Sequence, residues 1–315
     1  MAGKADHGGG VDAAAAQFGG ARNDWLDLST GINPCPYPLG NLPAGLWHTL
    51  PDEGAFYRLE TAARAFWNVP DAAAILAAPG ASALIARMPG LGAPGPVHIP
   101  GPTYNEHARA FAAAGWQVSD AMPTAETARV IVHPNNPDGR LWGPENLAPL
   151  TVIDESFCDV VPDATLMAHA TRPGTVILKS FGKFWGLAGL RLGFAIGDPA
   201  LIAKLAQSIG PWAVSGPALA IGTRALADAA WADATRARLH ADAARLDALI
   251  GLPVVGGTSL FRLYDAPDAR ALQTHLARAN IWTRAFPYSN RWLRLGLPGT
   301  ASDWARLEAA LRSRV

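Results

Sequence analysis

Lys183 is the residue of this sequence whose setting most suggests covalent chemistry. It stands in SFGKFWGLAGLRLGF (residues 180–194), after an apolar run and among glycines and aromatic residues, with Arg191 eight residues later. Apolar surroundings disfavour the charged form of a lysine and lower its pKa, which suits an amine nucleophile. The glycines would let the backbone turn tightly and approach a ligand. The structural alternative is a surface lysine beside a glycine-rich turn.

Three more segments carry polar groups next to apolar runs. Asp154 ends TVID, where an unpaired buried charge would be costly, so its carboxylate would pair with a heterocycle, bind a metal or cap the next helix. Asn136 lies in HPNNPDGR, which is either a plain turn or a turn that presents an amide to a ligand. In PGASALI, backbone N–H groups and the hydroxyl of Ser82 would form an anion site at the start of a helix, although many ordinary helices begin this way.

These segments belong to a pattern of short apolar runs that alternate with helical stretches. Helical spacing of apolar residues predicts helices over 53–67 and 105–114. Apolar runs followed by polar residues predict mostly parallel strands at 75–79, 97–100, 130–134, 151–155 and 175–181. The alternation is typical of a doubly wound α/β domain, which binds ligands beyond the carboxyl ends of its strands.

The remaining parts of the chain suggest three regions. Residues 1–45, rich in Gly, Pro and Asn, are expected to form an arm or lid with little regular structure. Residues 46–210 would form the large domain and 211–315 a smaller α+β domain, with the boundary near 211–217. Within the smaller domain, 217–250 predicts one long helix or two, and LFRLY and WLRLGL predict strands accompanied by two helices.

Composition limits the classes of function. The 26 basic and 26 acidic residues give a net charge of +0 without a basic block, which argues against nucleic-acid binding and a polybasic membrane anchor. Two cysteines are too few for a disulfide framework or a cysteine-only zinc site. No apolar stretch is long enough to span a membrane, so we expect a cytoplasmic protein. Only four of the basic residues are lysines, which leaves few rivals to Lys183 as a nucleophile.

The order of these motifs, with Tyr104 after a Pro-Thr step, resembles the fold-type I, pyridoxal-phosphate-dependent class I/II aminotransferase superfamily over nearly the whole chain. The most specific element is the string from Ser180 to Gly193. The resemblance implies an α/β fold with a large, doubly wound, mainly parallel sheet domain and a smaller α+β C-terminal domain. It also implies that the cofactor is pyridoxal 5'-phosphate.

The resemblance also assigns roles to individual residues. Lys183 would form a Schiff base with the cofactor aldehyde, Asp154 would pair with the pyridinium nitrogen, Asn136 would bond the phenolic oxygen, and Tyr104 would stack on the ring. Arg294, in WLRLGLPG, would grip the substrate carboxylate unless it is a surface arginine on an edge strand. The cofactor phosphate would be held by four residues, Ser180, Arg191 and the backbone of Ala81 and Ser82.

Two departures from the family pattern concern the site. Phe157 stands where aminotransferases commonly have a tyrosine that bonds the phenolic oxygen. Leu50-Pro51-Asp52 replaces a Tyr-Pro-Asp string whose tyrosine reaches the phosphate of the neighbouring subunit, which puts that contact in doubt. The interval from Asn136 to Asp154 is also short for the superfamily and implies a trimmed connecting helix.

The first 40 residues point to one branch of the superfamily. His7-Gly8-Gly9, followed by LDLSTGINPCPYP (26–38), resembles the start of the L-threonine-O-3-phosphate decarboxylases of cobalamin biosynthesis, and GPWAVSGPA (210–218) is similar to that group as well. This implies release of CO2 from threonine phosphate to form (R)-1-aminopropan-2-yl phosphate, with Lys183 as the proton donor. The substrate-binding residues would be His7, Ile32, Asn33, Arg284 and Arg294. Arg294 would bind the substrate carboxylate and Arg284 would lie near the substrate phosphate, or the two arginines would have the opposite roles.

Two alternatives stay open at this point. A histidinol-phosphate-type aminotransferase would use the same lysine and return the proton to a different atom. A scaffold protein that kept the fold and lost activity conflicts with the full set of cofactor residues. In either enzymatic interpretation the binding partner is a small-molecule substrate, a phosphorylated amino acid. We expect no metal, no nucleic acid and no membrane as further partners. The superfamily implies a homodimer.

Overall fold

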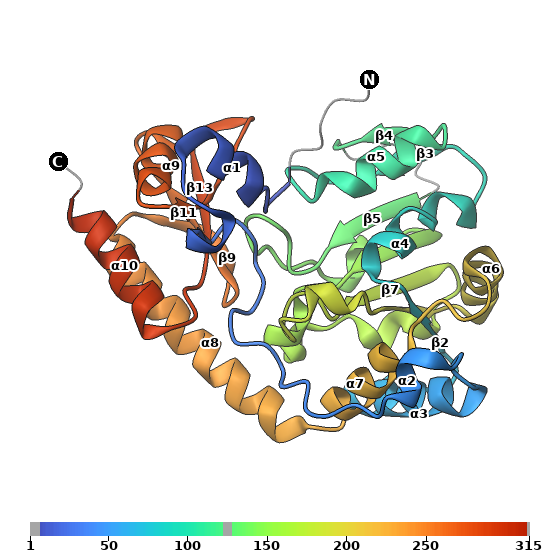
Figure 1. Ribbon diagram of the computed structural model, residues 1–315. Helices are drawn as coiled ribbons and strands as arrows, with labels where there is room; N and C mark the ends of the chain where they lie inside the picture. The colour runs from blue at the N-terminus through green and yellow to red at the C-terminus, as the bar shows by residue number, and fades with distance from the viewer. Residues whose placement is uncertain (1–6, 122–127, 314–315) are drawn as a thin grey trace. The chain divides into compact units, whose positions relative to one another are not determined.

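The computed structural model describes residues 7–121 and 128–313 and divides the chain into two compact units (Figure 1). The large unit comprises Pro36–Asn136 and Arg140–Ala234, and the small unit comprises Met1–Cys35, Pro137–Gly139 and Thr235–Val315. The units do not divide at the predicted boundaries, which were 45/46 and 210/211. The N-terminal segment belongs to the same unit as the C-terminal segment, and the division near residue 234 falls within α8 (Ala229–Ile250). The predicted domain boundaries stay a prediction.

The described part of the large unit contains a seven-stranded sheet with strand order β2-β8-β7-β6-β5-β3-β4. Its strands are β2 (Ala74–Ala78), β3 (Pro96–His98), β4 (Gln117–Ser119), β5 (Ala128–Val132), β6 (Leu150–Asp154), β7 (Thr175–Ser180) and β8 (Gly193–Gly197). All neighbouring pairs are parallel except those of β8, which runs antiparallel to both β2 and β7. The expected mainly parallel sheet is confirmed, and the carboxyl ends of β2, β3, β5, β6 and β7 therefore meet at one edge.

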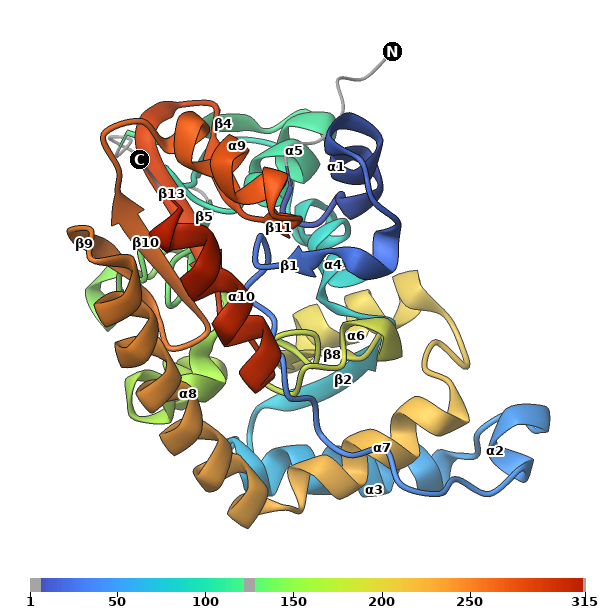
Figure 2. The same ribbon diagram turned by 60° about the vertical axis from the view of Figure 1, so that its left-hand side comes forward.

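Helices cover both faces of this sheet. One face packs against α4 (Ala81–Ile85), α5 (Asn105–Ala113) and α6 (Pro199–Ile209), which contribute Leu84, Phe111 and Leu205 to a common hydrophobic core. The other face carries α3 (Glu53–Phe66) and α7 (Gly216–Leu226), with α2 (Gly45–His48) beside them (Figure 2). Helix α7 packs closely on α3 because Gly222 leaves room for Leu59.

The strands alternate their side chains between these two faces, as the pleat requires. In β7, Val176 and Leu178 belong to the core shared with α4 and α5. Ile177 and Lys179 therefore point to the face that carries α3. The alternation decides which polar residues at the strand ends lie on the face of the sheet that packs against α4 and which lie on the face that carries α3.

The segment 217–250, predicted as one long helix or two, forms two helices. Helix α7 ends at Leu226, and the side chain of Asp228 accepts a hydrogen bond from the backbone N–H of Trp231 at 3.0 Å in the first turn of α8. An aspartate before a helix satisfies N–H groups that have no partner within the helix, and it starts a new helix rather than continuing the old one.

Two sheets form the described part of the small unit. The four-stranded one is antiparallel, with order β12-β13-β10-β9, and β1 pairs with β11 in a parallel ribbon. The strands are β1 (Leu26–Asp27), β9 (Val254–Thr258), β10 (Phe261–Asp265), β11 (Ile281–Trp282), β12 (Arg284–Phe286) and β13 (Ser289–Gly296). Helices α9 (Ala269–Arg278) and α10 (Ala301–Arg312) complete the expected α+β pattern.

The N-terminal segment has more regular structure than expected. Helix α1 (Val11–Phe18) packs Val11 and Ala14 with Trp25 and Ala277 in a small apolar cluster, so the prediction of an arm with little regular structure was wrong for these residues. The alanine-rich run VDAAAAQF is a good helix former and was the missed signal. Residues 1–6 of the expected arm lie outside the described residues. In the part of the chain that is described, no helix has the length and apolar character needed to cross a membrane.

Candidate active site

A pocket opens at the edge of the large unit where the parallel strands end. Its volume is about 620 Å³, including the part open to solvent. Every residue assigned to the cofactor from sequence lines it: Ala81, Ser82, Tyr104, Asn136, Asp154, Ser180, Lys183 and Arg191. The other lining residues are Ile85, Val132, Ser156, Phe157, Gly182 and Ala188. The topology brings them together because each follows the carboxyl end of a parallel strand or precedes the start of β8.

Asp154 is a fully buried carboxylate at the end of β6. Its Oδ2 lies 2.9 Å from Nε2 of His107, and its Oδ1 accepts hydrogen bonds from the hydroxyl of Ser156 at 2.5 Å and from the backbone N–H of Ser156 at 3.0 Å. Nδ1 of His107 is buried and has no hydrogen-bond partner among the described residues, so we place the proton on Nε2, which donates to Asp154. Burial alone would raise the pKa of Asp154, but the bonds from His107 and Ser156 outweigh it and hold the pKa below its ordinary value.

Lys183 lies in the turn after β7 and is half-buried. Its Nζ stands 5.3 Å from the ring centre of Phe157, the residue that replaces the family's tyrosine. Phe184 and Trp185, which follow it, are completely buried and pack with Trp231 in an aromatic cluster. The turn is thus anchored by the residues next to the lysine, while the amine itself faces the pocket.

Two glycines let Arg191 and the start of α4 approach each other. A Cβ on Gly80, whose φ is +89°, would lie 2.6 Å from Nη2 of Arg191, and a Cβ on Gly193 would lie 2.5 Å from the backbone nitrogen of Ala81. Any side chain at these positions would push apart the guanidinium and the N–H groups of the first helical turn. The hydroxyls of Ser82 and Ser180 line the same pocket.

Tyr104 and Asn136 are held next to each other by Asn135. The buried amide of Asn135 accepts a hydrogen bond from the hydroxyl of Thr103 at 2.6 Å and donates one to the carbonyl of Pro102 at 3.0 Å. These bonds tie the loop before Tyr104 to the loop that carries Asn136. Burial, with a smaller contribution from the charge of Asp154, raises the pKa of Tyr104 to about 12, so its hydroxyl stays protonated at neutral pH.

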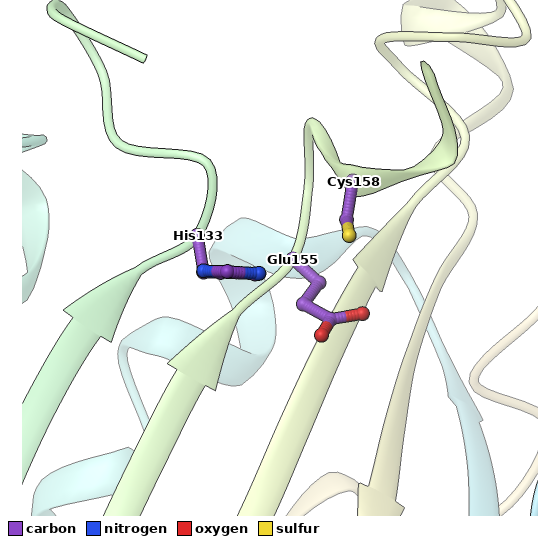
Figure 3. A group of neighbouring side chains, drawn as sticks. All are labelled: His133, Glu155 and Cys158. Atoms are coloured by element: carbon purple, nitrogen blue, oxygen red, sulfur yellow. The ribbon is translucent and has the colours of Figure 1, made fainter. Parts of the chain in front are cut away.

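A second polar group lies on the opposite face of the same strand ends. Figure 3 shows His133, Glu155 and Cys158 pointing toward one another from the ends of β5 and β6 and from the turn that follows. The group has the composition of a metal site, but Nδ1 of His133 accepts a hydrogen bond from the N–H of Trp142 at 3.0 Å and Nε2 donates to the carbonyl of Ala164 at 2.6 Å. Neither ring nitrogen has a lone pair left for a metal, and we interpret the group as a hydrogen-bonded network.

The residues assigned to substrate belong to the small unit. Arg294 of β13 is fully buried and donates from Nη2 to the carbonyl of Ser29 at 2.6 Å, while Arg284, its register partner on β12, donates to the carbonyl of His7 at 2.7 Å. Burial first, and then the neighbouring charge of Arg284, lower the pKa of Arg294 to about 10, so it keeps its charge at neutral pH. Gly8 is required here because a Cβ would lie 2.4 Å from the carbonyl oxygen of Ser29.

Asn33 and Ile32 lie in the same unit. Asn33 is buried, and its Oδ1 accepts hydrogen bonds from Nη2 of Arg238 at 2.6 Å and from the N–H of Cys35 at 3.0 Å. Two donors on the oxygen fix the orientation of the amide. Ile32 is half-buried.

Sequence reasoning missed the groups that support the pocket. His107 was available as a signal, because it shares the buried side of α5 with Phe111, four residues later, and follows Tyr104 by three residues. A histidine on the buried side of a helix needs a polar partner, and Asp154 is that partner. Ser156 and Asn135 are adjacent to named motif residues, but only the folded chain shows what their side chains contact.

The chain matches the family model for class I and II aminotransferases over residues 44–311. It is similar to threonine-phosphate decarboxylases from Sinorhizobium sp, at 42% identity, and from Pseudomonas aeruginosa, at 39%, with 97% of each chain covered in both cases. Among solved structures, it resembles a histidinol-phosphate aminotransferase from Sinorhizobium meliloti in complex with pyridoxal-5'-phosphate. That TM-score is 0.83 at 20% identity, over 98% of this chain and 95% of the other, and it shows the fold alone.

Replacing Ser156 with alanine removes one hydrogen bond to the ionised Asp154 and should lower the free energy of unfolding of the cofactor-free protein at pH 7 by about 1.5–3 kcal/mol. The depressed pKa of Asp154 gives stability that is present above the unfolded pKa of about 3.9 and is lost as the pH falls through the folded value. The unfolded pKa is the same in both proteins, so the difference between them should narrow as the pH falls from the folded pKa of Asp154 in the variant toward the lower folded pKa in the wild type, as measured by urea denaturation.

The control is Ser208→Ala, since the hydroxyl of Ser208 donates to the neutral carbonyl of Leu205. Its effect should not change over the same pH range. A Ser156→Ala difference that does not narrow at any acidic pH at which both proteins still fold would contradict a contribution of Ser156 to the low pKa of Asp154.

Proposed function

The chain belongs to the class I and II aminotransferase family, and we propose that it is a pyridoxal-5'-phosphate-dependent carboxy-lyase acting on L-threonine O-3-phosphate. The products are (R)-1-aminopropan-2-yl phosphate, which serves the aminopropanol arm of cobalamin, and CO2. The full-length likeness to two threonine-phosphate decarboxylases carries the choice of substrate. The pocket of the large unit supports the choice of cofactor.

The donor set of the pocket fits pyridoxal phosphate. One part offers the guanidinium of Arg191, the hydroxyls of Ser82 and Ser180 and the first N–H groups of α4, a combination that suits a phosphate. The end of β6 offers a carboxylate that its neighbours hold ionised, which suits a protonated ring nitrogen. Lys183 adds a primary amine to the same pocket.

The bound cofactor supplies an aldehyde for the substrate amine and a conjugated ring that accepts the electron pair left when CO2 departs. Asp154 keeps a proton on the ring nitrogen, and it can do so because His107 and Ser156 stabilise its anion. Asn136 binds the phenolic oxygen, and Tyr104 lies against the ring face. The backbone of Ala81 and Ser82, with Ser180 and Arg191, anchors the phosphate.

Lys183 has two tasks in this proposal. Its amine would hold the cofactor covalently, and once the substrate amine has taken that place, the amine of Lys183 would deliver a proton to the substrate Cα. The bond from Cα to the carboxylate carbon would break, the conjugated ring would take up its electron pair, and that pair would form the new Cα–H bond with the proton from Lys183. Delivery of the proton to Cα, rather than to the cofactor, separates decarboxylation from transamination.

The substrate has two anionic groups, and the small unit supplies two arginines on neighbouring strands. We assign the carboxylate to Arg294, whose planar fork can bind it with two hydrogen bonds. Arg284, with His7, Ile32 and Asn33, is assigned to the region of the substrate phosphate.

We also propose a cytoplasmic homodimer. Large apolar side chains are exposed along residues 39–57 of the large unit, including Trp47, Leu50 and Tyr57, of which Trp47 and Tyr57 are 69% and 71% exposed. Apolar residues gathered on one surface segment are typical of protein interfaces. A second copy of the chain is the partner that the superfamily implies.

The purified holoprotein should release CO2 from L-threonine O-3-phosphate and form an amine without any keto acid. Lys183→Ala should lose the absorbance of lysine-bound cofactor and lower kcat by about 100-fold or more, whereas Lys204→Ala on the surface of α6 should change neither. Stoichiometric conversion of the cofactor to its amine form without CO2 would refute the decarboxylase and favour a histidinol-phosphate-type aminotransferase.

Arg294→Lys keeps the charge but loses the fork, so kcat/KM for threonine phosphate should fall by about 10- to 100-fold while cofactor binding is retained. Arg291→Lys is the control on the same strand, because Arg291 is exposed and pairs with Asp265. An unchanged kcat/KM in Arg294→Lys would contradict the carboxylate assignment.

Trp47→Asp places a charge on the exposed apolar segment and should shift the protein from dimer to monomer in sedimentation velocity at micromolar concentration. Val254→Asp, on the exposed strand β9 of the small unit, should leave the dimer intact. A wild-type chain that sediments as a monomer would contradict the dimer itself.

A further inference from the structure

Lys179 is a fully buried lysine that the proposed chemistry does not use. Its Nζ lies 2.6 Å from Oε2 of Glu155 and 3.4 Å from Oδ1 of Asp159, and all three side chains are at most 3% exposed. Burial by itself would lower the pKa of Lys179, but the two carboxylates outweigh burial and raise it. Burial likewise works against the anion of Glu155, and Lys179 outweighs it and lowers that pKa. The pair is therefore charged at neutral pH.

The rest of the network satisfies the remaining oxygens. Oε1 of Glu155 accepts from the N–H of Leu166 at 2.6 Å, and Oε2 accepts from the hydroxyl of Thr165 at 2.7 Å. Oδ1 of Asp159 accepts from the indole N–H of Trp67 at 2.9 Å. A buried ion pair is expensive to desolvate and is therefore a weak source of stability. We therefore look for a role of this ion pair other than stabilising the fold.

The reason lies in the alternation of two adjacent strands. Asp154 and Glu155 are consecutive at the end of β6, and Lys179 and Ser180 are consecutive at the end of β7. Consecutive residues of a strand point to opposite faces, so Asp154 and Ser180 point into the pocket, while Glu155 and Lys179 point to the opposite face of the sheet and form the network. The backbone N–H of Glu155 also donates to the carbonyl of Leu178 at 3.0 Å, which continues the pairing of the two strands to this point.

We propose that the ion pair between Lys179 and Glu155, braced by Asp159 and Thr165, is a positioning element for the cofactor. It joins the ends of β6 and β7 from behind and thereby sets the separation between Asp154, assigned to the ring nitrogen, and Ser180, assigned to the phosphate. The inference rests on the proposed cofactor. The inference adds residues that do not contact the cofactor. These residues set the distance between the group assigned to the ring nitrogen and the group assigned to the phosphate.

The variant that tests this is Glu155→Gln, which keeps the shape of the side chain and removes its charge. In metal sites, residues that orient the ligand-holding groups change affinity by roughly 10–100-fold, so we expect the Kd for pyridoxal phosphate to rise by about tenfold or more. We also expect a changed circular dichroism of the bound cofactor in the visible range. Both are measured by titrating the cofactor-free full chain with pyridoxal phosphate at a temperature where all variants are folded.

The matched control is Asp247→Asn in the small unit. Asp247 is also a carboxylate that is ion-paired to an arginine, Arg262, at 2.9 Å and accepts a hydrogen bond from a tyrosine, Tyr264, at 2.8 Å. Asp247→Asn should lower the melting temperature and leave both the Kd and the visible circular dichroism unchanged. If Glu155→Gln does not fold, Thr165→Val replaces it under the same criterion; this variant removes one hydrogen bond to Glu155 and the acceptor of the Met167 N–H, and it leaves the charges of the ion pair in place.

A Kd for Glu155→Gln, or for Thr165→Val in its place, within twofold of the wild-type value would overturn the inference and leave the proposed function standing. Equal weakening by the control would also overturn it, because the effect would then follow general stability. A wild-type chain that binds no pyridoxal phosphate would remove both the inference and the proposed function.

Discussion

The carboxylate of Asp154 is buried in the large unit, and the proposed function requires it to stay ionised so that it pairs with a protonated ring nitrogen. Burial opposes that ionisation, and only the donors around it, His107 and the two groups of Ser156, reverse the balance. This requirement determines much of the local architecture. Helix α5 must present a histidine on its buried side. The turn after β6 must place Ser156 so that its hydroxyl and backbone N–H both donate to the carboxylate of Asp154.

The edge of the sheet where these residues lie is polar on both faces. On the face shared with α4, the side chains of Asp154 and Ser180 reach the pocket, while on the face of α3 the charges of Glu155 and Lys179 neutralise each other. Buried charge is tolerated on the second face because every carboxylate oxygen of Glu155 has a donor. The parallel arrangement makes this possible, since it aligns the polar ends of three neighbouring strands at one edge.

The small unit handles charge differently. Its two arginines stand on adjacent antiparallel strands, and backbone carbonyls of the N-terminal segment accept their hydrogen bonds. Carbonyl acceptors orient a guanidinium without neutralising it. Gly8 permits this close packing, which gives the His-Gly-Gly segment at the start of the chain a structural purpose.

The sequence by itself determined the fold class and five of the seven described strands of the large sheet, all except β4 and β8, because apolar runs are local signals. It also determined the motifs that carry the eight assigned residues of the pocket. It also pointed to Phe157 and to two arginines, Arg294 of WLRLGL and Arg284. It did not reveal α1 or the antiparallel strand β8, and it left open whether 217–250 is one helix or two. Nor did it reveal the partners of the buried charges: His107 meets Asp154 from 47 positions away, and Lys179 meets Glu155 from another strand. Those contacts were decided only by the tertiary structure, since hydrogen bonds that hold a buried charge depend on which strands and helices become neighbours, and no spacing in the sequence encodes that.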